Sequence, residues 1–185
     1  MAEGIILAAG YASRAQANKM LFLVDGKPLI DHVIAGMRPC VNHIYVVTGH
    51  YHEAIASHLR DEHVTCAFNP NYQEGMFSSV KRGVRAVVED FFVIPGDCPF
   101  VSRATYQRLM ETDEPISVPV YGKRKGHPIF ISIALKRALL ESGPDMNLKA
   151  FRDRYDYEAI AVDDSHIIDD IDTLADLAAF RKGRT

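Results

Sequence analysis

The chain has 185 residues, of which 48% are hydrophobic and 24% are charged, and its formal net charge is −3. This length and composition predict one compact domain over residues 1–185 and exclude a disordered chain. The slight negative charge argues against a nucleic-acid-binding protein, because a nucleic-acid-binding face needs an excess of Lys and Arg.

Short apolar runs alternate with helical patterns in the first half of the chain. Residues 5–9, 44–47, 64–68 and 91–94 have the length and composition of buried strands. Apolar residues recur at helical spacing between them, from Leu29 to Met37 and from Met76 to Val87. This alternation predicts right-handed βαβ crossovers. We therefore expect an α/β fold, a mostly parallel twisted sheet flanked by helices on both faces, with ligands at the carboxyl ends of the strands.

The second half of the chain has a different pattern. Residues 116–120, a basic turn at 121–126 and residues 128–131 predict a small hairpin insertion, which we expect to form a flap on the substrate side. Residues 159–162 then predict another strand, and apolar residues from Leu174 to Phe180 predict a final helix.

Cysteine usage and the N-terminus give expectations about location. Cys40, Cys66 and Cys98 are too few and too widely spaced for a disulfide framework or a zinc knuckle. The apolar run at residues 5–9 is too short to cross a bilayer or to form a signal-peptide core. We expect a cytoplasmic protein with reduced thiols and no membrane anchor.

A candidate phosphate-binding loop follows the first strand. Small residues there let backbone N–H groups approach a ligand, and two cations offer a guanidinium fork and an ammonium for polyphosphate oxygens. An ordinary strand-to-helix turn with two solvated cations fits the spacing equally well. The segment matches neither GxGxxG nor the Walker A pattern, which disfavours a dinucleotide enzyme and a P-loop NTPase. The residues concerned are Leu7, Ala8, Ala9, Gly10, Ser13, Arg14 and Lys19.

Asp97 is the strongest candidate for a metal ligand. It follows the apolar run 91–94 and lies between Gly96 and Pro99, in a sharp turn at the end of a buried strand. Magnesium binds one or two carboxylates together with phosphate oxygens. The alternative, that Asp97 caps the next helix, is less favoured because Ser102 is better placed for that role. Asp170 and Asp172 form a second acidic group, although carboxylates before a helix are also common N-terminal caps.

Two polar segments complete the candidate site. Residues 69–79, which include Asn69, Gly75 and Ser79, could contact the edge of a nucleobase, although turn formation and helix capping explain most of the same residue types. The basic turn before Gly126 and His127 either holds an anionic acceptor or faces water.

Taken together, these segments resemble the molybdenum cofactor cytidylyltransferases of the MobA-like nucleotidyltransferase superfamily. The similarity extends from Gly4 to about Phe180 and includes several motifs in the same order. These are the LAAG loop with Ser13, Arg14 and Lys19, then residues 26–29, residues 69–79, the turn at 96–99, the triplet 126–128 and the tetrad 170–173.

The resemblance implies a Rossmann-like nucleotidyltransferase fold, a function and a set of site residues. In that family the loop, its arginine and its lysine hold the triphosphate, the aspartate binds magnesium, and a pterin phosphate attacks. The LAAG form implies CTP as the donor, and a molybdoenzyme is a further possible partner. The implied catalytic residues are Lys19, Arg14 and Asp97, and the implied Mg²⁺ ligands are Asp97, Asp170 and Asp172. The implied acceptor-binding residues are Gly126, His127 and Lys149. The implied nucleotide-binding residues are Leu7, Ala8, Ala9, Gly10, Ser13, Asn69, Gly75 and Ser79.

The chain also departs from the family pattern. Gln16, Asn147 and Lys149 stand where the family usually has glycine, glycine and arginine. Lys149 cannot reproduce a bidentate arginine contact, and the side chain of Gln16 could crowd a triphosphate. Three alternatives therefore stay open: guanylyl transfer to the same pterin, cytidylyl transfer to another phosphorylated acceptor such as phosphocholine, and a cofactor-binding maturation chaperone without turnover.

Overall fold

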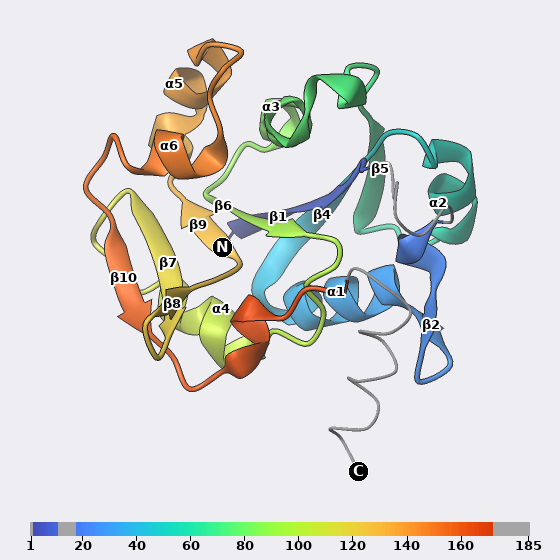
Figure 1. Ribbon diagram of the computed structural model, residues 1–185, viewed down its shortest axis with the longest axis horizontal. Coiled ribbons are helices and arrows are strands. Elements are labelled where there is room, and N and C mark those ends of the chain that lie inside the picture. Colours follow the sequence, from blue (N-terminus) through green and yellow to red (C-terminus); the bar gives the residue numbers. More distant parts are fainter. Residues whose placement is uncertain (1, 11–17, 172–185) are drawn as a thin grey trace.

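The computed structural model describes residues 2–10 and 18–171. Its main sheet has eight strands in the order β10-β7-β9-β6-β1-β4-β5, with β8 paired to β7 (Figure 1). The strands are β1 (Ala2–Ala8), β4 (Val41–Thr48), β5 (Val64–Phe68), β6 (Phe91–Pro95), β7 (Ile116–Tyr121), β8 (Arg124–Lys125), β9 (Ile129–Ile131) and β10 (Glu158–Ala161). The short strands β2 (Leu23–Val24) and β3 (Lys27–Pro28) form a separate two-stranded sheet.

The sheet is mostly parallel, as the alternation of strands and helices predicts. β1 pairs in parallel with β4 and β6, β4 pairs in parallel with β5, and β10 pairs in parallel with β7. The four strands expected in the first half and the one expected near residue 160 are present. The expectation that 64–68 is a buried strand is wrong, because β5 lies at the edge of the sheet and only its Ala67 is buried. Their carboxyl ends place Ala8, Thr48, Phe68 and Pro95 along one edge of the sheet.

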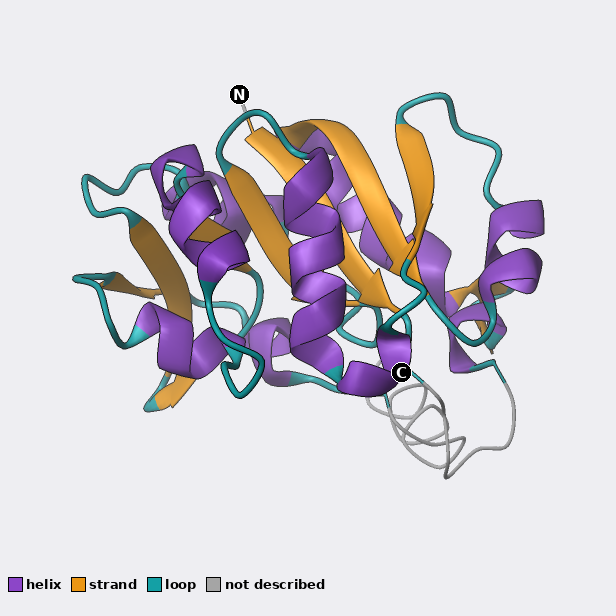
Figure 2. Ribbon diagram, turned by 90° about the horizontal axis from the view of Figure 1, so that it is seen from above, coloured by secondary structure: helices purple, strands orange, loops and turns teal. Residues whose placement is uncertain are grey.

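Helices cover both faces of this sheet. α3 (Met76–Ala86), α5 (Lys136–Glu141) and α6 (Leu148–Arg152) lie on one face, whereas α1 (Leu29–Met37) and α4 (Arg103–Leu109) lie on the other (Figures 1 and 2). α2 (His52–His58) packs beside β5. The alternation of side chains along β1 divides the core into two clusters. Ile6 packs with the α1 and α4 residues, and Ile5 packs with Val80 and Val84 of α3.

The segment expected to be a flap is part of the main sheet. β9 lies between β6 and β7 and is antiparallel to both, and the β7–β8 hairpin extends from the end of β7. Ile129 and Ile131 are buried in the core, which explains this position, because a flap would expose them to water.

Two sequence expectations concern other parts of the chain. Ser102 caps α4 as predicted, since its Oγ accepts a hydrogen bond of 3.3 Å from the N–H of Thr105. The helix expected from Leu174 to Phe180 lies outside the described residues. Within the described part of the chain, no helix is long and apolar enough to span a membrane.

Candidate active site

Lys19 and Asp97 form an ion pair at the carboxyl edge of the sheet. Lys19 Nζ lies 2.5 Å from Asp97 Oδ2, and the two side chains are 19% and 20% exposed. Lys19 begins the short 3-10 helix η1 (Lys19–Leu21), and Asp97 follows β6. The structure therefore brings together the cation after the first strand and the carboxylate after a central strand, which are far apart in the sequence.

Local hydrogen bonds position both partners. Asn18 caps η1, since its Oδ1 accepts from the N–H of Met20 at 3.2 Å. The N–H of Gly96 donates to the carbonyl of Leu7 at 2.9 Å, which joins the turn after β6 to the end of β1. Ala8 and Ala9 are buried at this end of β1, and Gly10 is exposed. The predicted loop thus leaves the sheet directly beside Asp97.

Asp170 joins the site from the other end of the chain. The N–H of Ile171 donates to the backbone carbonyl of Asp97 at 3.0 Å, which fixes this segment against the turn. Cys98 lies between the two acidic side chains, and its Sγ is 3.2 Å from Asp170 Oδ1 and 3.8 Å from Asp97 Oδ1. Burial raises the pKa of the Cys98 thiol, and the charges of Asp97 and Asp170 raise it further. Cys98 is therefore a neutral thiol, and its single S–H donates to Asp170, the nearer of the two carboxylates.

His127 is buried next to the same carboxylates. The backbone N–H of His127 donates to the carbonyl of Ile167 at 2.8 Å. The Nδ1 atom of its imidazole ring has no hydrogen-bond partner among the described residues. Burial lowers the pKa of the imidazole, and the charges of Asp170 and Asp97 oppose this effect. A Cβ on Gly126 would lie 2.1 Å from the carbonyl oxygen of Ile167, so this close approach requires glycine. A buried ring nitrogen without a partner beside two acids is suited to contact a ligand.

The acidic cluster has the composition of a divalent-cation site. Asp97, Cys98 and Asp170 offer ligand atoms that all lie within 4.8 Å of one another. Two carboxylates match the preference of Mg²⁺ and Mn²⁺ for oxygen ligands. The residues present therefore fit a hard divalent cation.

The segment 69–79 has a different character. Asn69 is 3% exposed, and its Nδ2 donates to Ser78 Oγ at 2.9 Å and to Ser79 Oγ at 3.0 Å. Its Oδ1 accepts from the N–H of Asn71 at 3.1 Å. Gly75 is exposed at the start of α3. The structure thus gives Asn69 and Ser79 a role in stabilising this segment, and their contact with a nucleotide stays a prediction.

Lys149 is exposed on α6. The hydrogen bond from Arg152 lowers the pKa of the nearby Asp153, and the charge of Lys149 contributes to the same effect. The neighbouring Asn147 caps the same helix, because its Oδ1 accepts from the N–H of Ala150 at 2.9 Å. This cap gives a structural reason for asparagine at the position where the family usually has glycine. The role of Lys149 in binding an acceptor stays a prediction.

Three predicted residues, Ser13, Arg14 and Asp172, lie outside the described residues, as does Gln16. One residue of the site was missed as a functional residue. From the sequence, Cys98 is considered only among the reduced thiols, and the contact of Cys98 with Asp170 depends on the folding of two distant segments. The position of Cys98 directly after Asp97 was the only local signal.

Comparisons with known proteins place this arrangement in context. The family model described as the MobA-like NTP transferase domain matches residues 4–159. The molybdenum cofactor cytidylyltransferase of Escherichia coli (strain K12) is 28% identical over 188 residues, which cover 98% of this chain and 96% of that protein. The crystal structure of Rv0371c from Mycobacterium tuberculosis H37Rv has a TM-score of 0.84 at 20% identity, over 98% of both chains. Its complex with manganese has a TM-score of 0.77 at 19% identity, over 97% of this chain and 95% of that chain.

Proposed function

Since the chain belongs to the MobA-like NTP transferase domain family, we propose that it transfers CMP from CTP to the terminal phosphate of molybdopterin cofactor and releases pyrophosphate. The observation that carries this proposal is the Lys19–Asp97 pair next to Asp170 at the carboxyl edge of the sheet. The similarity to the Escherichia coli cytidylyltransferase over nearly the whole chain supports the choice of donor and acceptor.

The proposed reaction is an in-line displacement. An oxygen of the acceptor phosphate forms a bond to the α-phosphorus of CTP, and the bond from that phosphorus to the oxygen bridging to the β-phosphate breaks. Pyrophosphate leaves with the electron pair of the broken bond. Catalysis of this kind depends on positioning and on neutralising negative charge.

Lys19 and Arg14 are the proposed cationic groups for the triphosphate. Lys19 Nζ lies 2.5 Å from Asp97 Oδ2, so its ammonium is placed at the carboxyl edge of the sheet, where phosphates would lie. We propose that the Lys19 ammonium exchanges its contact with Asp97 for one with the triphosphate oxygens. It would then stabilise the negative charge of the departing pyrophosphate. Leu7, Ala8, Ala9, Gly10 and Ser13 would surround the triphosphate, with Asn69, Gly75 and Ser79 near the base.

Asp97 and Asp170, with Asp172, are the proposed ligands of Mg²⁺. When bound, the cation would supply Lewis-acid stabilisation of the phosphate oxygens. The manganese complex of the structural relative is consistent with a divalent cation in this fold. His127 lies beside these acids and follows Gly126. We propose that the Nδ1 of His127, which has no hydrogen-bond partner among the described residues, contacts the acceptor phosphate. Lys149 is proposed as a further acceptor contact.

The test measures pyrophosphate release with each of the four nucleoside triphosphates, Mg²⁺ or Mn²⁺, and molybdopterin cofactor. We expect turnover with CTP and little with the other three. Thermal shift with the same nucleotides reports binding independently of turnover, because a ligand that binds only the native state raises the melting temperature.

The other outcomes each contradict the proposal in a different way. Turnover with GTP alone would make the protein a guanylyltransferase. Turnover with CTP and phosphocholine, but not with the pterin, would replace the acceptor. Tight nucleotide binding without pyrophosphate release from any donor would identify a cofactor-binding chaperone for a molybdoenzyme.

A further inference from the structure

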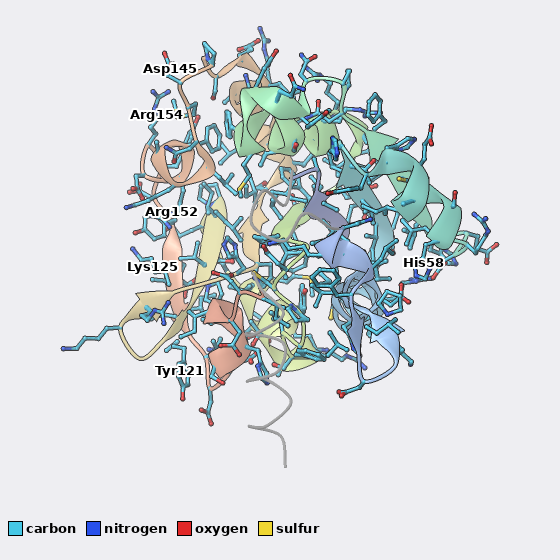
Figure 3. The ribbon with its side chains drawn as sticks, turned by 45° about the vertical axis from the view of Figure 1, so that its right-hand side comes forward. His58, Tyr121, Lys125, Asp145, Arg152 and Arg154 are labelled. Carbon is cyan, nitrogen blue, oxygen red and sulfur yellow. The ribbon has the colours of Figure 1, made fainter. Side chains whose placement is uncertain are left out.

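A polar cavity lies along α3, between this helix and the loop that joins α5 to α6. Its volume is about 330 Å³, and none of Lys19, Asp97, Asp170 and His127 lines it. This volume is within the range of small-molecule sites. The loop on one side of the cavity carries Asp145, which is labelled in Figure 3. Asn69, one of the proposed nucleotide-binding residues, lines the cavity, so the cavity is a candidate site next to the proposed nucleotide site and apart from the acidic cluster.

Two cations line this cavity from one face of α3. Lys81 and Arg85 are four residues apart, which places them one above the other on the helix. Like charges at this spacing destabilise a helix. Glu74 is the only carboxylate that lines the cavity, so the described side chains leave it with an excess of positive charge.

The walls of the cavity are held by contacts of their own. Lys81 Nζ donates to the carbonyl of Ser142 and lies 5.5 Å from the centre of the Phe77 ring, so its ammonium is fixed at the wall. On the other side, Ser78 Oγ donates to the carbonyl of Asn71 at 2.8 Å. A site whose walls are ordered before binding loses less entropy when a ligand enters.

We propose that this cavity binds a small phosphorylated molecule, with Arg85 as the main contact of its phosphate group. The guanidinium of Arg85 can donate two parallel hydrogen bonds to phosphate oxygens, and the ammonium of Lys81 adds a point charge at the wall. Phe77 and Pro144 provide apolar surface for an organic portion. The proposed phosphate contacts, Arg85 and Lys81, belong to neither the acidic cluster nor the proposed nucleotide-binding residues, although Asn69 borders both sites.

The experiment titrates the protein with inorganic phosphate and follows backbone amide shifts by NMR. We expect the amides of Ser78, Lys81, Arg85 and Ser142 to move. Arg85→Gln should weaken phosphate binding by about tenfold to a hundredfold, which is the scale of losing hydrogen bonds to a charged group. Arg85 is exposed, so this substitution should leave the amide spectrum otherwise unchanged.

Arg82→Gln is the matched control, because Arg82 lies on the same helix, donates to the carbonyl of Phe68 and does not line the cavity. Lys19→Met separates this cavity from the proposed catalytic site, and the α3 shifts should persist in that variant. The proposal is overturned if Arg85→Gln binds phosphate as the unsubstituted protein does. It is also overturned if the shifts are confined to Gly10 and residues 96–98 and are lost in Lys19→Met.

Discussion

Two polar clusters near the carboxyl edge of the sheet differ in how their side chains are satisfied. In the segment before α3, the Asn69 amide bonds to Ser78, Ser79 and the Asn71 backbone, so its members satisfy one another. In the acidic cluster, two carboxylates lie close together beside His127, whose Nδ1 has no partner among the described residues. The first arrangement fixes the conformation of a loop, whereas the second leaves a buried ring nitrogen available to a ligand. Residue types that look equally polar in the sequence can thus serve opposite purposes.

The largest expected effect is that of Asp97→Ala on turnover. We expect the rate of pyrophosphate release to fall by a factor on the order of a hundred or more, which is the scale of losing one electrostatic stabiliser. Asp31→Ala is a suitable control, because Asp31 contacts His58 at 2.8 Å and belongs to neither cluster. Near-normal turnover of Asp97→Ala with Mg²⁺ would contradict the assignment of Asp97 and the acidic cluster to catalysis.

A second substitution tests the structural cluster. Asn69→Ala removes three hydrogen bonds from a buried position, and we expect the free energy of unfolding to fall by about 1–3 kcal/mol. Urea denaturation measures this change. Asn71→Ala, at an exposed position of the same segment, should change the free energy of unfolding by less than about 0.5 kcal/mol. Equal effects of the two substitutions would contradict the role assigned to Asn69.

The smallest expected effect concerns Cys98, which connects the two carboxylates. Cys98→Ala removes the donor between Asp97 and Asp170, and we expect the affinity for Mn²⁺ to fall by about tenfold, the lower end of losses at residues that support metal ligands. Electron paramagnetic resonance of free Mn²⁺ measures this affinity directly. Cys98→Ser keeps a hydrogen-bond donor and should retain most of the Mn²⁺ affinity, whereas Cys66→Ala should leave this affinity unchanged. Unchanged affinity in Cys98→Ala would show that the thiol only fills space.

Local patterns in the sequence were sufficient for much of the fold. The apolar runs in β1, β4 and β6 predict a buried parallel sheet, because strands covered on both faces are rich in apolar residues. The cap at Ser102 and the turn that presents Asp97 follow equally from nearby residues. The family resemblance, carried by motifs in order, is confirmed by the match over residues 4–159.

The tertiary structure alone decided which side chains meet. Asp170 and Cys98 are 72 positions apart and Lys19 and Asp97 are 78 apart, so no local pattern predicts their contacts. The position of β9 inside the sheet, where a flap was expected, depended on burying Ile129 and Ile131 in the common core. Periodicity and turn chemistry are properties of neighbouring residues, whereas burial and electrostatic environment arise only when distant segments pack against each other.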